Sequence, residues 1–156
     1  METFIDIQRK FVNTILQLSE AEKVANRTPF RIAAQPLLLE RGSRLNIVQH
    51  SGGGPLQYAI RNNFFVQTGH TPEFIRYQTD TEGGASGSPV CNDAWQAVAL
   101  HHASRSVPAS QVPQEVIDGN PIEVKVLNEA ITLHAILNDL PAELKQRILA
   151  AQSLIS

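Results

Sequence analysis

The sequence predicts a mainly β domain with a helix at its N-terminus and helices at its C-terminus. Short apolar runs alternate with turns rich in glycine, asparagine and proline over residues 45–101, a spacing typical of a β-barrel or a β-sandwich. Apolar residues recur at steps of three and four over residues 3–25, which indicates an amphipathic helix. Helical periodicity returns over residues 123–139, and Pro141 is placed to open another helix. We therefore divide the chain into an N-terminal helix (1–28), a β domain with a closing helix (29–140) and a C-terminal helix (141–156).

The individual strands follow from alternation and from the turn residues between them. Residues 45–50 alternate and end at a glycine-rich turn, and residues 57–67 form a second strand that we expect to be broken near Asn62. The remaining strands are expected at residues 74–77, 89–91 and 95–101, before a long surface loop over residues 104–121. The N-terminal helix should end before Pro29, and it either covers an open end of the β domain or docks another protein.

Composition excludes several classes of protein. The chain has 156 residues, 42% of them hydrophobic, and a formal net charge of −2, values typical of an ordinary globular domain. Its arginines are scattered without interleaved aromatic residues, so we expect no nucleic-acid partner. No apolar stretch is long enough to cross a bilayer, and the first residues lack the pattern of a signal peptide. The single cysteine, Cys91, permits no internal disulfide, which favours a cytoplasmic protein.

Residues 83–90 have the sequence GGASGSPV, and the candidate chemistry centres on them. Three glycines and a proline exclude a helix interior and indicate a tight loop whose backbone amides are free to point at a ligand. A nucleophilic serine needs this arrangement, because N–H groups must face the oxyanion that develops when the hydroxyl attacks a carbonyl. Ser86 is therefore the candidate nucleophile. The elbow of α/β-hydrolases does not fit, since Ser88 stands where that motif requires glycine.

Residues 77–90, YQTDTEGGASGSPV, and residues 95–102, WQAVALHH, resemble the nucleophile region of trypsin-like serine peptidases. The branch that they resemble most is that of bacterial glutamyl endopeptidases, and the likeness covers roughly residues 44–140. The resemblance implies a six-stranded β-barrel that corresponds to the second half of the two-barrel fold. It also implies that Ser86 attacks the peptide carbonyl and that the amides of Gly84 and Ser86 form the oxyanion hole. Thr81 and His101 fall where the family lines the pocket for the substrate side chain.

The preferred substrate side chain stays open. His101, when protonated, would favour an acidic side chain, whereas the nearby Asp80 would favour a basic one. His101 and His102 are neighbours on one strand and point to opposite faces, so they cannot chelate one metal ion together. We expect neither a metal nor a cofactor.

The chain departs from the family in what precedes Ser86. Trypsin-like enzymes take their catalytic histidine and aspartate from the first barrel, but residues 1–40 contain no histidine and a single aspartate, Asp6. One hypothesis is therefore a peptidase half, inactive alone, that needs both residues from another chain or segment and acts on a peptide or protein. The alternative is a catalytically inactive binding or regulatory module; by resemblance, such members belong to bacterial defence or signalling systems. An in-chain dyad of Ser86 with a histidine is a third, less favoured reading. We also expect a partner chain or self-association, because an isolated barrel exposes an apolar face.

Overall fold

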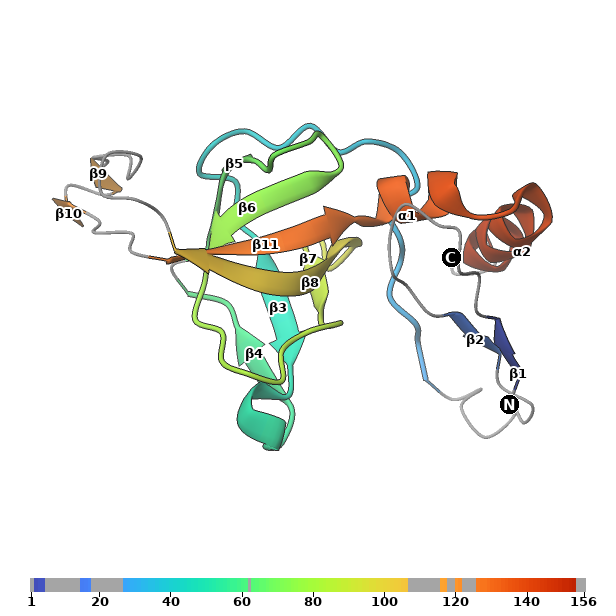
Figure 1. The fold of residues 1–156 in the computed structure, drawn as a ribbon, viewed down its shortest axis with the longest axis horizontal. Coiled ribbons are helices and arrows are strands. Elements are labelled where there is room, and N and C mark those ends of the chain that lie inside the picture. The colour runs from blue at the N-terminus through green and yellow to red at the C-terminus, as the bar shows by residue number, and fades with distance from the viewer. Residues whose placement is uncertain are drawn as a thin grey trace.

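The computed structural model describes residues 2–4, 15–17, 27–61, 63–106, 116–117, 120–121 and 126–153 (Figure 1). Its main element is a seven-stranded antiparallel sheet with the strand order β4-β3-β7-β8-β11-β6-β5. The strands are β3 (Asn46–Gln49), β4 (Gln57–Ala59), β5 (Phe64–Thr68), β6 (Phe74–Gln78), β7 (Pro89–Cys91), β8 (Ala97–Ser106) and β11 (Val126–Thr132). The predicted mainly β class is confirmed.

The sheet curls until its two edges meet. The edge strands β4 and β5 follow each other in the chain, and the segment before β3 pairs with β5: Phe65 N–H donates to Ser43 (2.8 Å), and Gly42 N–H donates to Phe65 (2.9 Å). The Leu45 N–H donates to the Asn63 carbonyl in the same way (3.1 Å). The family resemblance implied six strands, and the sheet has seven: residues 57–67 form two strands, β4 and β5, on either side of the break expected near Asn62, and β11 is a strand that the pattern did not predict.

Alternation along the strands builds the interior of the barrel. Ile75 and Tyr77 of β6 are buried in a cluster with Leu45, Ile47 and Val90, while Arg76 between them points to the outer face. On that outer face, Cys91, Ala97 and Ile131 pack against the helix α1 (Leu133–Asp139). The hydroxyl of Thr132 caps α1 by accepting from the Ala135 N–H (3.3 Å).

The helix α2 (Ala142–Ser153) follows α1 beyond one end of the sheet (Figure 1). It is the C-terminal helix expected after Pro141. The Gln152 side chain accepts a hydrogen bond from the Ile32 N–H (2.8 Å), which ties α2 to the segment that enters the barrel. No helix among the described residues has the length and apolar content needed to cross a membrane.

Two predicted helical segments are wrong where they can be compared. Within residues 3–25, the described parts are strands, β1 (Glu2–Phe4) and β2 (Ile15–Gln17), paired antiparallel. The rest of that predicted helix lies outside the described residues. Thr3, Phe4 and Ile15 are β-branched or aromatic, so their apolar spacing is compatible with strands as well as with a helix.

The closing helix was expected from residue 123 but begins only at Leu133. Residues 126–132 are instead the central strand β11, paired with β8 on one side and β6 on the other. Backbone pairing along both edges outweighs the weak helical periodicity of this segment. Within the expected loop 104–121, β8 extends to Ser106, and the strands β9 (Val116–Ile117) and β10 (Asn120–Pro121) pair with each other. The other residues of that loop after Ser106 lie outside the described part.

Candidate functional site

The serine loop, which we define as residues 82–88, is the later part of the connection from β6 to β7, and Ser86 within it is exposed. Two turn bonds shape it: the Ala85 N–H donates to Glu82 (3.2 Å), and the Ser88 N–H donates to Ala85 (3.0 Å). Gly84 and Gly87 have φ values of +97° and +85°, in the left-handed region that side chains disfavour. The glycines are therefore required by the backbone path that presents Ser86.

Hydrogen bonds fix the serine loop on both sides. The Gly87 N–H donates to the His101 carbonyl (2.7 Å), and the His101 N–H donates to the Ser88 carbonyl (2.9 Å), which joins the loop to β8. On the other side, the Gly52 N–H donates to the Gly83 carbonyl (2.7 Å). A Cβ atom at position 84 would lie 3.1 Å from the His50 carbonyl oxygen, so the two loops are in close contact. Backbone hydrogen bonds therefore fix the position of the loop that carries Ser86.

The N–H groups of Gly84 and Ser86 have no hydrogen-bond partner among the described residues. Gly84 and Ser86 are both exposed, so these N–H groups are open to solvent beside the Ser86 side chain. Such a pair can donate to an anionic oxygen beside the hydroxyl.

His101 is buried beneath this loop. Only 4% of it is exposed, and its Nδ1 lies 2.8 Å from the hydroxyl of Tyr77, which is fully buried. Burial, followed by the charge of neighbouring His102, lowers the pKa of His101. Burial also raises the pKa of Tyr77, so its phenol stays protonated. His101 is therefore a neutral hydrogen-bonding group at neutral pH.

The lowered pKa of His101 predicts a stability that declines in acid. The unfolded chain protonates this ring as the pH falls below the ordinary value of 6.5, whereas the folded chain resists the proton. In acid the unfolded state therefore binds more protons than the folded state, and the free energy of unfolding decreases as the pH is lowered. Urea unfolding of wild type and His101→Gln at about pH 7.5 and about pH 5 should show a smaller decline in the variant. Equal declines would contradict the assignment.

A second polar group joins the strands next to His101. The Asn128 side chain of β11 accepts from Thr81 Oγ1 (2.6 Å) and from Ser104 Oγ (2.7 Å), and donates to the Thr79 carbonyl (2.8 Å). Asn128 is 3% exposed, so it holds Thr81 in place from inside the sheet. Tyr77, Ser104 and Asn128 were not among the predicted site residues. The available signal was the pair of polar residues Asn128 and Glu129 between apolar neighbours, in a stretch that pattern alone assigned to a helix.

Asp80 lies apart from His101. It is exposed and lines a groove of about 700 Å³ together with Thr81, Glu82, Gln49 and Tyr58. No interaction between Asp80 and His101 occurs in the described structure, whereas the backbone of His101 contacts the serine loop directly. The structure thus brings Ser86, Gly84 and His101 together, links Thr81 to them through Asn128 and β8, and leaves Asp80 facing the groove.

No histidine hydrogen-bonds the Ser86 hydroxyl, although all five belong to the described residues. Each contacts another group: His50 the Gly54 carbonyl (3.0 Å), His101 Tyr77, His134 the Ala34 carbonyl (2.8 Å), and His70 and His102 the Glu129 carboxylate (3.9 and 3.3 Å). The backbones of His50 and His101 both adjoin the serine loop. The Nδ1 of His50 must carry the proton that it shares with the Gly54 carbonyl.

An open strand edge begins beside Ser86. β8 pairs with β7 from Ala97 to Leu100, and with β11 from Ala99 to Ser106. Beyond His101, β8 therefore has a strand neighbour on its β11 side only, within the part of the chain that the structure describes. An extended peptide can pair with such an edge through its main chain. The described residues contain no group of three or more histidine, cysteine, aspartate or glutamate side chains placed to hold a metal ion.

Comparisons with known proteins support the family and the fold. A family model described as a trypsin-like peptidase domain matches residues 13–100, more than half of the chain. A protein of Sinorhizobium fredii described as uncharacterized protein y4fB is 40% identical over 78 residues. The alignment covers 47% of this chain and 12% of that relative, so most of the relative lies outside the match.

Proposed function

Because the chain belongs to the trypsin-like peptidase domain family, we propose that it is the serine-bearing half of an endopeptidase. In this proposal the barrel corresponds to the second barrel of the two-barrel fold, in its glutamyl-endopeptidase form. The observation that carries the proposal is the exposed Ser86 hydroxyl between two unpaired backbone N–H groups, next to the open edge of β8.

The chemistry would be acyl transfer. Ser86 Oγ attacks the carbonyl carbon of a peptide bond, and the N–H groups of Gly84 and Ser86 donate to the resulting oxyanion. The proton of Oγ passes to a base and then to the leaving amine, and water later releases the acyl group from Ser86 by the reverse steps. The chain supplies the nucleophile and the donors. The base and its orienting carboxylate come from a second chain or segment.

Substrate binding would use the edge of β8 and the groups around it. A peptide paired with β8 beyond His101 brings a carbonyl to Ser86, because the Gly87 N–H holds the serine loop on His101. His101 and Thr81 would then contact the side chain before the cleaved bond. His101 is buried and neutral at neutral pH; when the Tyr77 hydroxyl donates to Nδ1, the ring carries its proton on Nε2 and donates it to an acidic side chain. Asp80 lines the groove on the β4 side and would favour basic groups there.

Two observations support an external source for the base. None of the five histidines hydrogen-bonds Ser86, and each has another partner. The matched relative extends far beyond the aligned segment, which leaves room in that protein for further domains. The same absence of a bonded histidine favours the second candidate, an inactive binding module, in which Ser86→Ala leaves partner binding unchanged.

A fluorophosphonate probe, which labels activated serines, tests the proposal. The chain is incubated with the probe alone and with the products of neighbouring genes, and Ser86→Ala serves as the control. We expect slow labelling alone and fast labelling at Ser86 with the complementing chain, because a positioned base contributes about 10²–10⁴-fold. Absence of labelling at Ser86 under both conditions would leave the binding module as the function.

A further inference from the structure

A buried carboxylate lies on the outer face of the barrel, away from the interior cluster. Glu129 of β11 follows Asn128 and precedes Ala130, which is buried inside the barrel, so the Glu129 side chain points outward. Even so, Glu129 is fully buried, with an exposed fraction of 0%. Other side chains must therefore cover it.

Two arginines and two histidines provide the cover. Oε2 of Glu129 lies 3.1 Å from Nε of Arg76 and 3.9 Å from Nδ1 of His70, and Oε1 lies 3.3 Å from Nε2 of His102 and 3.4 Å from Nε of Arg105. These residues come from both neighbouring strands and from the turn before β6. We call Glu129, Arg76, Arg105, His70 and His102 the Glu129 cluster.

A β-bulge places two of these side chains on one face. The pairing of β8 with β11 shifts at Glu129, which faces Ala103, while Ala130 faces His101. His102 is thus the extra residue of β8, and the shift lets His102 and Arg105 reach the same carboxylate. A regular strand would point residues 102 and 105 to opposite faces.

The carboxylate stays ionised despite its burial. Burial alone would raise the pKa of Glu129, but hydrogen bonds from Arg76, His102 and Arg105 outweigh burial and lower it. With neutral imidazoles, the cluster therefore carries two guanidinium charges against one carboxylate charge, an excess of one positive charge.

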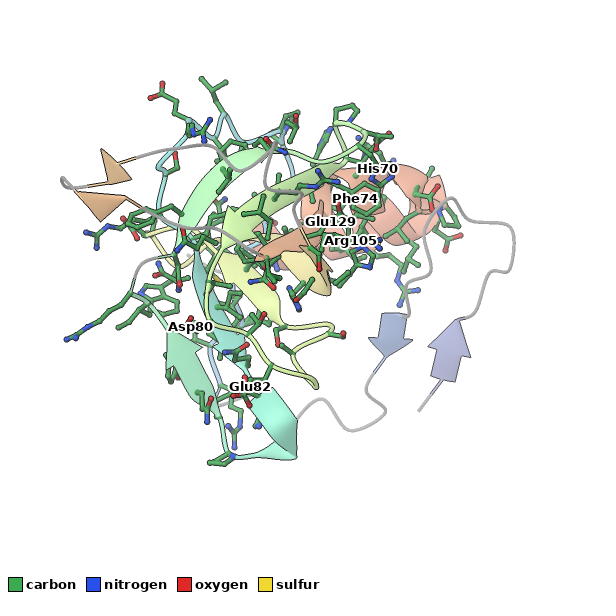
Figure 2. The ribbon with its side chains drawn as sticks, turned by 60° about the vertical axis from the view of Figure 1, so that its left-hand side comes forward. His70, Phe74, Asp80, Glu82, Arg105 and Glu129 are labelled. Carbon is green, nitrogen blue, oxygen red and sulfur yellow. The ribbon has the colours of Figure 1, made fainter. Side chains whose placement is uncertain are left out.

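The positive groups are accessible from solvent. The side chains of His70, Arg105 and His102 are 58%, 54% and 42% exposed, and that of Arg76 is 26% exposed. Both arginines use Nε for Glu129, and their terminal nitrogens have no partner among the described residues. The ring of the half-buried Phe74 stacks on His70 (4.6 Å between centroids) and lies 5.6 Å from His102, so the two imidazoles share one aromatic neighbour. Figure 2 shows His70, Phe74, Glu129 and Arg105 gathered in one region, apart from Asp80 and Glu82.

We propose that the Glu129 cluster is a docking site for an acidic segment of a partner protein, bound through aspartate or glutamate side chains. The free forks of two guanidinium groups match carboxylate oxygens, and Glu129 holds both forks on one surface. The two guanidinium charges exceed the single charge of Glu129, so the cluster attracts acidic side chains. The site does not depend on the chemistry of Ser86.

Fluorescence anisotropy with the full chain tests this site. The probe is a fluorescein-labelled oligoglutamate peptide, with oligoglutamine and phosphoserine peptides as comparisons. We expect oligoglutamate to bind, more weakly as salt is raised, and Arg105→Gln to weaken binding roughly tenfold. Arg44→Gln removes the same charge from an exposed arginine outside the cluster and should leave the affinity unchanged.

Histidine resonances provide a readout that does not depend on variants. In ¹H–¹⁵N spectra, the ring signals of His70 and His102 should shift as oligoglutamate is added, while that of His134, which bonds the Ala34 carbonyl outside the cluster and outside the candidate site, should not. Equal binding of oligoglutamine, equal weakening by Arg44→Gln, or shifts confined to His134 would overturn the proposal. Binding of the phosphoserine peptide without binding of oligoglutamate would overturn the choice of carboxylate.

Discussion

Replacing Arg76 with alanine is expected to lower the free energy of unfolding by about 3 kcal/mol, because it removes the shortest ion pair of a buried carboxylate. The remaining partners, Arg105 and His102, lie farther from Glu129 and are more exposed, so they compensate only in part. The same replacement in a Glu129→Gln background should cost less than about 1 kcal/mol, since no buried charge then remains unpaired.

Urea unfolding of the four chains of this double-mutant cycle measures the coupling. Arg44→Ala is the matched control, an exposed arginine without an ion pair in the described structure, and should change stability little. The pKa of Glu129 is lowered in the folded state, so the coupling should be complete above about its ordinary value of 4.5 and disappear as the pH falls further. An equal cost of Arg76→Ala in both backgrounds would contradict the role of Glu129.

Local patterns predicted the strands well because the barrel is built from short alternating segments. Ile75, Arg76 and Tyr77 alternate between core and surface, and the glycine-rich turns at residues 51–54 and 83–87 end the strands where expected. The segment after residue 123 was misassigned because Leu127 and Ile131 fit either a helix or a strand. Only pairing with β6 and β8, which are distant in sequence, determines that β11 is a strand.

The candidate site could also be predicted only in part from the sequence. Glycines and a proline around Ser86 constrain the backbone locally, so the serine loop was visible in the sequence. Asn128 and Glu129 were not, because their partners lie on other strands and one of them depends on a β-bulge. Networks across a sheet depend on register, which a single sequence does not reveal.

Free imidazole should accelerate fluorophosphonate labelling of Ser86 in the isolated chain. The N–H groups of Gly84 and Ser86 have no partner among the described residues and the hydroxyl is exposed, so under the proposed function the site needs only a base to accept the proton. A small base from solution is not positioned, so we expect an increase of at least about tenfold, below the roughly 10²–10⁴-fold of a positioned group. Ser86→Ala should abolish the labelling, and peptide mapping should place the label on Ser86.

The labelling rate at Ser86 as a function of imidazole concentration is therefore the most direct test of the proposal that the chain is the serine-bearing half of a peptidase. We predict slow labelling without imidazole, a rate that rises with its concentration, and no effect of His50→Ala. A rate that does not respond to imidazole would contradict the claim that Ser86 needs only a base in order to react. Fast labelling without imidazole that His50→Ala abolishes would show that the chain contains its own base, and would contradict the need for a second chain or segment.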